Sequence, residues 1–396
     1  MKSIKLKTLI ISLLVLVCFS CSTDNDPNQE IENPTADFNF NVNIAVSGEG
    51  VTFNDTSEAG SGTITSWNWT FTGATPNTST EQNPTVVFNS KGEFSVTLVV
   101  TANDGGTASA SKDILAIEGC EVYDCEKFLV EVETNINYGV DTQSHIMNIY
   151  KPRGDLRVNK PALLLSGGGQ YEGSNLSNLE PLAQRLASYG FVVATARYRD
   201  GVGDGTGNLM RGMVDSKAAV RHLRANAEDY NINPNEIFTG GWASGAYNAL
   251  AHAYWQFEDI NPPELYAFVT DVMGWIDNWE GVQGNNGESS EVVGVVNLGG
   301  SIFGQYEAYQ DDLWITSSDV PMFAVHGSAD VETPCDALEL ETGNWEFGSC
   351  VIHQRLLDVG VSSTLYTIEG GVHESPRLPE NIDNYIEDLV GFLSGE

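Results

Sequence analysis

A short turn between a predicted strand and a predicted helix constrains this chain most. The apolar run Glu236–Thr239 leads into Gly240-Gly241-Trp242-Ala243-Ser244-Gly245-Ala246, and a helix-favouring run over 247–255 follows. Glycines at 241 and 245 are typical of a tight strand-to-helix turn, because glycine adopts backbone conformations that strain other residues. The central residue of that turn is Ala243, and the serine stands one place later at Ser244.

Length and charge limit the classes of function. A chain of 396 residues predicts about two domains plus a targeting segment. Its 54 acidic and 19 basic residues give a formal net charge of −35. That charge repels phosphate backbones and anionic lipids, so we expect no nucleic-acid partner. We attribute the acidity to the solubility of an exported protein.

The first 33 residues predict export. Lys2, Lys5 and Lys7 precede an apolar run over 9–19, the layout of a signal peptide, and a run of that length is too short to be a transmembrane anchor of ~20 residues. Cys18-Phe19-Ser20-Cys21 resembles a bacterial lipoprotein signal, which implies that residues 1–21 end at a lipidated Cys21. Residues 22–33 then form a flexible acidic tether. The resemblance implies the outer membrane or cell surface of a Gram-negative bacterium, with membrane contact through the lipid only.

The sequence pattern of residues 34–118 predicts a small all-β sandwich. Runs with period-two alternation at 51–53, 86–88 and 94–100 are separated by Gly, Asn, Asp and Ser, which predicts strands. The region contains Ala36-Asp37-Phe38, Gln82-Asn83-Pro84 and the runs 51–57, 64–71 and 92–98. In these segments it resembles a PKD domain, which implies a spacer or adhesion role. Trp67 and Trp69 share a strand face, where we favour a core position over a sugar-stacking platform.

Four cysteines beyond the signal form two close pairs. Cys120 with Cys125 and Cys335 with Cys350 are the simplest of the three possible pairings, and disulfides suit an exported chain. We prefer them to a metal site, because no histidine stands at ligand spacing from either pair. No metal or cofactor is expected.

Residues 119–396 predict a mostly parallel sheet covered by helices, since apolar runs alternate with helical patterns. The segment 258–291 interrupts this alternation and is a candidate lid or pocket wall. The expected strands cover 162–165, 191–195, 236–239, 292–296, 322–325 and 363–367, and the expected helices cover 179–189, 213–227, 243–257, 350–359 and 381–393. The predicted fold class is therefore α/β, with an all-β domain in front.

Four segments in this region resemble the carboxylesterase and hormone-sensitive-lipase branch of the α/β-hydrolases. They are Ser166-Gly167-Gly168-Gly169, the turn at Ala243, His326-Gly327-Ser328-Ala329-Asp330 and Gly370-Gly371-Val372-His373. The resemblance implies that Gly168, Gly169 and Ser244 supply an oxyanion hole, that position 243 is the nucleophile, and that Asp330 orients the general base His373. Tyr198-Arg199 and the runs 215–227 and 233–238 also resemble this branch and are expected to be scaffold.

The chain departs from the family pattern at two positions. Ser166 stands where the family has histidine, and Ala243 stands where it has the nucleophilic serine. A methyl group cannot attack a carbonyl carbon. His145, His222, His252 and His353 are interpreted as packing or surface residues.

Three interpretations of Ala243 stay open at this stage. In the first, the domain binds an ester or glycan without cleaving it. In the second, Ser244 attacks through a distorted turn. In the third, the alanine is an engineered or sequencing change in an active parent. Two functions follow: a surface ester hydrolase acting on a small ester or an acylated polysaccharide, or a silent relative that serves as a glycan- or ester-binding or adhesion protein. The oligomeric state cannot be predicted.

Overall fold

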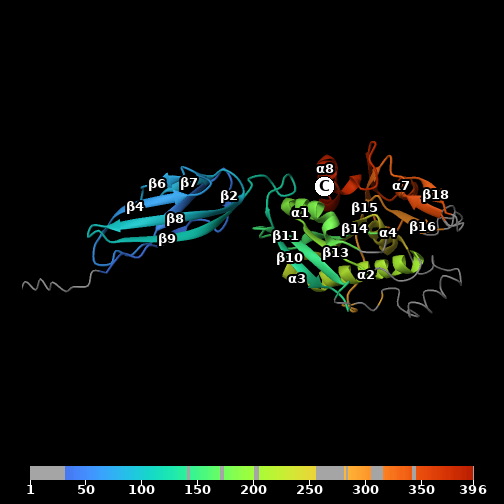
Figure 1. Ribbon diagram of the computed structural model, residues 1–396, viewed down its shortest axis with the longest axis horizontal. Coiled ribbons are helices and arrows are strands. Elements are labelled where there is room, and N and C mark those ends of the chain that lie inside the picture. The colour runs from blue at the N-terminus through green and yellow to red at the C-terminus, as the bar shows by residue number, and fades with distance from the viewer. Residues whose placement is uncertain are drawn as a thin grey trace, which may run out of the picture.

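The computed structural model describes residues 32–140, 143–169, 174–199, 205–255, 281, 284–304, 315–340 and 345–395. Figure 1 shows two units side by side along the longest axis, a β-sandwich and a larger α/β unit. The predicted signal peptide with Cys21, most of the tether, and the central part of the candidate lid lie outside the described residues. None of the helices in the described ranges is both long and apolar enough to cross a bilayer.

The first unit is a sandwich of two sheets, with strand orders β1-β3-β7-β5 and β2-β9-β8-β4-β6. The strands predicted at 51–53, 86–88 and 94–100 lie within β3, β7 and β8. The bounds are β1 Phe38–Phe40, β2 Ala45–Val46, β3 Gly50–Asp55, β4 Ile64–Phe71, β5 Ala74–Thr75, β6 Thr78–Ser79, β7 Thr85–Phe88, β8 Gly92–Ala102 and β9 Thr107–Ile117.

The two tryptophans of β4 have different surroundings. Trp69 is fully buried, its ring stacked on Phe71 at 5.7 Å between centroids, and it donates from Nε1 to the carbonyl of Glu81. Trp67 is partly exposed, and its Nε1 donates to a carboxylate oxygen of Asp55 at 2.7 Å. Trp69 is therefore a core residue, as preferred from the sequence.

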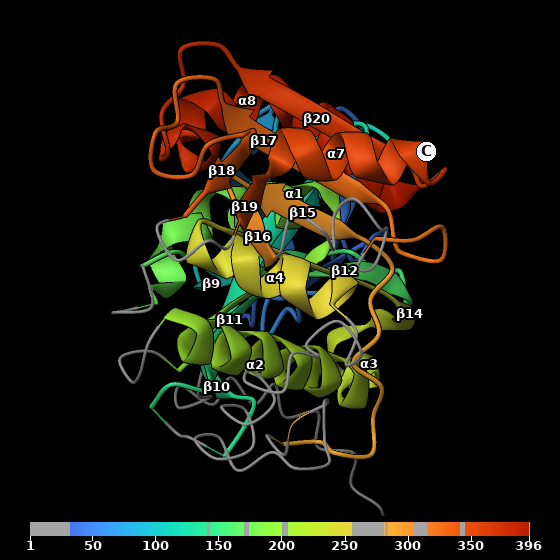
Figure 2. The same cartoon turned by 90° about the vertical axis from the view of Figure 1, so that its right-hand side faces the viewer.

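The second unit is built on one eight-stranded sheet of order β10-β11-β13-β12-β14-β15-β17-β20. In this order the strands from β13 to β20 run parallel. At one edge β11 pairs antiparallel with β13, and β10 pairs antiparallel with β11. The bounds are β10 Leu129–Asn137, β11 Ile146–Arg153, β12 Lys160–Ser166, β13 Val192–Ala196, β14 Ile232–Trp242, β15 Val295–Leu298, β17 Met322–Gly327 and β20 Ser363–Ile368. A parallel sheet needs cover on both faces, and helices supply it (Figure 2).

The helices divide into two groups by the core that they bury. α1 and α8 pack together on one face, while α2, α4 and α7 contribute to the cores on the other. Three short strands form a separate antiparallel sheet of order β16-β19-β18. The bounds are η1 Leu176–Leu179, α1 Glu180–Tyr189, α2 Gly205–Ala225, α3 Ala227–Tyr230, α4 Ser244–Tyr254, β16 Ser301–Gly304, β18 Ala337–Glu339, β19 Trp345–Gly348, α7 Ser349–Asp358, η3 Ser375–Arg377 and α8 Pro379–Ser394.

Several predicted boundaries are wrong, among them the starts of α2, β15 and α4. α2 begins at Gly205 rather than 213, because burial of Leu209 and Met210 outweighs the low helix propensity of its glycines. β15 begins at Val295 rather than 292, since the chain bends at Val293. α4 begins at Ser244, which leaves Ala243 outside the helix as its N-cap.

Both predicted disulfides are present. Cys120 is bonded to Cys125 between the two units, and Cys335 is bonded to Cys350 at the start of α7. Within the described ranges no three His, Cys, Asp or Glu side chains are grouped for a metal ion.

Candidate active site

The backbone of the turn at Ala243 is strained. Ala243 has φ 53° and ψ −126°, a region that residues with a side chain rarely adopt. The flanking glycines permit it, because a Cβ at Gly241 would lie 2.4 Å from the backbone of Gly245, and a Cβ at Gly245 would lie 2.0 Å from the carbonyl oxygen of Ser166. The turn therefore presents residue 243 at the carboxyl end of the sheet, between β14 and α4, and the group it presents is a methyl.

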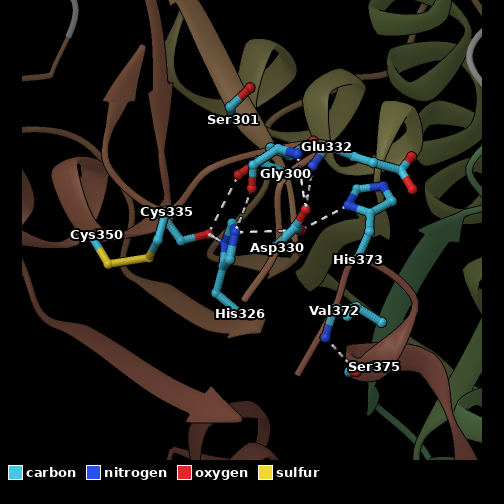
Figure 3. A network of polar contacts seen from close by, with 12 residues as sticks. Gly300, Ser301, His326, Asp330, Glu332, Cys335, Cys350, Val372, His373 and Ser375 are labelled. Atoms are coloured by element: carbon cyan, nitrogen blue, oxygen red, sulfur yellow. Dashed lines mark hydrogen bonds and ion pairs between the residues drawn. A yellow bond between two sulfur atoms is a disulfide. The ribbon is translucent and has the colours of Figure 1, made fainter. Parts of the chain in front are cut away.

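His373 and Asp330 come together from two loops that follow neighbouring strands. Asp330 follows β17 and His373 follows β20, and the ring Nδ1 lies 2.8 Å from a carboxylate oxygen of Asp330 (Figure 3). The other carboxylate oxygen accepts from the backbone N–H groups of Glu332 and Thr333 at 3.0 and 2.9 Å. This arrangement fixes the carboxylate and leaves Nε2 of His373 as the nitrogen available for proton transfer.

The contact between Asp330 and His373 lowers the pKa of the aspartate and raises that of the histidine. Burial alone would raise the pKa of Asp330, but the hydrogen bond from His373 and the N–H of Thr333 outweigh it and lower that pKa. Burial would lower the pKa of His373, yet the hydrogen bond to Asp330 and the charges of Asp330, Glu332 and Glu374 raise it above 6.5. Asp330 is therefore ionised at neutral pH, and it stabilises the protonated imidazole that a general base forms.

A buried histidine supports Asp330 from the other side. His326 of β17 lies with its Nε2 2.7 Å from the carbonyl of Thr333 and 3.5 Å from the Asp330 carboxylate (Figure 3). Because a carbonyl only accepts, Nε2 carries the proton, and burial lowers the pKa of this ring so that it stays neutral. Its Nδ1 then accepts from the hydroxyl of Ser349 at 2.7 Å. His326 thereby ties the loop that carries Asp330 to the first turn of α7.

Ser244 is directed away from the pair. Its side chain is buried, and its hydroxyl lies 2.9 Å from the hydroxyl of Tyr198. Tyr198 in turn donates to the carbonyl of Gly167 at 3.1 Å, so Ser244 is the donor to Tyr198. This geometry weighs against Ser244 as an attacking group and assigns its hydroxyl to the packing beneath the turn.

We expect Ser244→Ala to lower the free energy of unfolding by about 1 kcal/mol, the contribution of one buried hydrogen bond. The rate at which the native chain releases p-nitrophenol from p-nitrophenyl acetate should not change. Chemical denaturation and the colorimetric assay measure the two effects. Loss of a native activity in Ser244→Ala would show instead that the nucleophile stands at 244.

Two glycine peptides lie beside the turn, and the carbonyl of each accepts a hydrogen bond from a side chain. The carbonyl of Gly167 accepts from Tyr198, and the carbonyl of Gly168 accepts from Nδ2 of Asn178 at 3.2 Å. In a trans peptide the N–H points opposite to the carbonyl, so these bonds also orient the N–H groups of Gly168 and Gly169. Those two N–H groups have no hydrogen-bond partner among the described residues. They are placed to donate to a ligand oxygen, as an oxyanion hole does.

A pocket of about 320 Å³ joins these groups. Its lining combines the two glycines, polar side chains, three charged residues and one aromatic face: Gly168, Gly169, Asn175, Asn178, Trp242, Ala243, Glu332, His373, Glu374 and Arg377. Trp242 is fixed by a hydrogen bond from its Nε1 to the carbonyl of His373 at 2.9 Å. The structure thus brings Ala243, His373, Gly168 and Gly169 to one pocket, with Asp330 behind His373.

The remaining predicted residues lie away from this pocket. His145 is buried and contacts the fully buried Asp215 at 3.0 Å, and Asp215 also pairs with Arg199. His252 is buried against Ser216, while His222 and His353 are partly exposed. The sequence reading missed Asn178 and Arg377, since an asparagine in a loop and an arginine after His373 match no motif.

Comparison with known families agrees with this architecture. Residues 31–117 match the family model of the PKD domain, and residues 147–340 match that of BD-FAE. Gut esterase 1 of Caenorhabditis elegans is 34% identical over 110 residues, which are 25% of this chain and 19% of that protein. Gut esterase 1 of Caenorhabditis briggsae is 32% identical over 140 residues, 33% of this chain and 24% of that protein. The chain therefore spans less than a quarter of the length of these curated relatives.

Solved structures that resemble the chain include Thermogutta terrifontis esterase 2 phosphoramylated by tabun, with TM-score 0.49 and 18% identity over 67% of this chain and 94% of that one. Another is a truncated form of a carbohydrate esterase from gut microbiota, with TM-score 0.46 and 19% identity over 67% and 97%. The family models and the sheet order together carry the assignment. The chain contains a PKD domain followed by an esterase-like α/β-hydrolase domain, in which residues 147–340 match the BD-FAE family model.

Proposed function

We propose that the α/β-hydrolase domain binds esters, including acylated sugars, without hydrolysing them. One observation carries this proposal: the strained turn is intact and presents the methyl group of Ala243, while the neighbouring hydroxyl of Ser244 is bonded to Tyr198. The pocket keeps oriented N–H donors for a carbonyl oxygen and a positioned imidazole. An ester can therefore dock against the glycines, with no nucleophile to attack it.

The place of action that we propose is the cell surface. The sequence of residues 1–33 supports a lipid anchor at Cys21 with an acidic tether, and two disulfides suit an oxidising compartment. In this arrangement the PKD domain is the spacer between the anchor and the ester-binding pocket.

The test is binding without turnover. The native chain from residue 22 onward is titrated with p-nitrophenyl butyrate, following both complex formation and p-nitrophenol release. We expect Gly168→Ala to weaken binding about tenfold or more, because its Cβ would lie 2.7 Å from the Trp242 ring and 2.9 Å from the Ala243 methyl and would occupy the place of the ligand oxygen. Gly287→Ala is the matched control, since a Cβ there meets nothing within 4 Å. Binding that is equally strong in both variants would contradict the pocket assignment.

A second candidate is ester hydrolysis by the native chain itself. The complete His373–Asp330 pair favours it, because ester binding alone does not need a general base. Turnover by the native chain above the level of the His373→Ala variant would support an active esterase and contradict silent binding.

A further inference from the structure

An arginine side chain lies in the pocket without a fixed anionic partner. Arg377 ends η3, four residues after His373, and its guanidinium lies 4.3 Å from the centre of the Trp242 ring. Its Nε is buried and has no hydrogen-bond partner, and no ion pair joins Arg377 to a carboxylate anywhere in the described part of the chain. Arg197 also has a buried Nε without a hydrogen-bond partner, so the feature that distinguishes Arg377 is its place in the pocket lining.

The charge balance of the protein makes this guanidinium more unusual. Acidic residues outnumber basic ones by 54 to 19, and other arginines pair with them, as Arg153 does with Glu93 and Arg185 with Asp383. Two glutamates, Glu332 and Glu374, line the same pocket as Arg377. Their charges act on His373, whose pKa they help to raise. Neither glutamate forms an ion pair with Arg377 in the described part of the chain.

The stacked geometry favours a planar anion. A guanidinium presents N–H donors in one plane, and these match the two oxygens of a carboxylate. We propose that Arg377 and Trp242 form a subsite for a carboxylate group on the bound ester. This inference rests on the proposed function, and it names the class of ligand: an acidic ester.

Two kinds of ligand carry a carboxylate at that position. The sugar half supplies it when the ester is built on a uronate, and the acyl half supplies it when the acid is a dicarboxylic half-ester. Trp242 directly precedes Ala243, so either carboxylate would lie next to the carbonyl that the glycine N–H groups bind.

The experiment titrates the native chain with matched pairs of probes by ligand-observed NMR. One pair is methyl 2-O-acetyl-β-D-glucuronide and the neutral methyl 2-O-acetyl-β-D-glucoside. The other is monomethyl succinate and the neutral methyl levulinate. We expect the acidic member of at least one pair to bind about tenfold more tightly than its neutral partner, the effect of one charged hydrogen-bonded pair. The pair that shows the preference identifies the half that carries the carboxylate.

Arg377→Gln should abolish the preference, and Arg377→Lys should restore only part of it. Arg153→Gln is the matched control, because it removes one positive charge at an exposed ion pair with Glu93 and should keep the preference. Equal binding of acidic and neutral probes in both pairs, or a preference unchanged in Arg377→Gln, would overturn the subsite. Binding of neutral esters that survives in Arg377→Gln leaves the proposed function standing, whereas failure of the native chain to bind any ester contradicts the function itself.

Discussion

Ala243→Ser is expected to give this chain ester hydrolase activity, with turnover of p-nitrophenyl acetate rising by about three to six orders of magnitude over the native chain. The upper figure is the loss that follows removal of the nucleophilic serine from an intact triad. The lower figure allows for an imperfect fit of the new hydroxyl. Release of p-nitrophenol by the purified variants measures the effect.

The geometry around position 243 is the reason for so large a gain. The backbone already has the strained φ of 53°, so serine requires no new distortion. His373 lines the same pocket. Its Nδ1 is hydrogen-bonded to Asp330, and its Nε2 is available as a base. Gly168 and Gly169 supply N–H donors beside the turn. Compared with a complete Ser-His-Asp triad, this site lacks the hydroxyl oxygen that serine at position 243 would supply.

The control is the double variant Ala243→Ser with His373→Ala, which should fall back by several orders of magnitude because serine loses its base. Circular dichroism and the denaturation midpoint show whether each variant folds. A folded Ala243→Ser variant no faster than the native chain would contradict the assignment of position 243 or of His373, and would favour a pocket that evolved away from acyl transfer altogether.

Local patterns were sufficient to predict most of the fold and the core of the site. β12, β13 and β17 contain continuous apolar runs, which are typical of buried parallel strands. Asp330 and His373 were predicted from the resemblance of their segments to the esterase branch, and each follows a predicted strand, so that their loops meet at one edge of the sheet. The structure places the two side chains 2.8 Å apart.

What the sequence could not supply depends on side-chain direction and on contacts between distant segments. Ser244 and Ala243 are neighbours in the chain, yet only the turn geometry decides that the hydroxyl of Ser244 faces Tyr198. Asn178 donates a hydrogen bond to Gly168, and the guanidinium of Arg377 lies over the ring of Trp242, 135 positions away in the chain. The strands β16, β18 and β19 are only three or four residues long, too short for a periodic signal.

Asp330→Asn, made in the Ala243→Ser background, is expected to lower kcat by about 10³- to 10⁴-fold, the size of the effect when a triad aspartate becomes asparagine. The asparagine oxygen can keep the hydrogen bonds from the N–H groups of Glu332 and Thr333, so the loop stays in place. Its NH₂ group then faces Nδ1 of His373. Because two donors cannot pair, Nδ1 must give up its proton, and the proton moves to Nε2, the nitrogen that has to accept from serine.

The pH dependence separates this mechanism from a simple loss of structure. In Ala243→Ser, turnover should rise as His373 loses its proton, with the acid limb above pH 6.5 because Asp330, Glu332 and Glu374 raise the pKa of His373. Without the Asp330 charge, burial lowers the pKa of the ring, so the acid limb of Asp330→Asn should move to lower pH. Asp383→Asn, at an exposed ion pair with Arg185, is the matched control and should leave both rate and profile unchanged. A rate loss with an unmoved acid limb would show that Asp330 supports the loop and does not act on the imidazole.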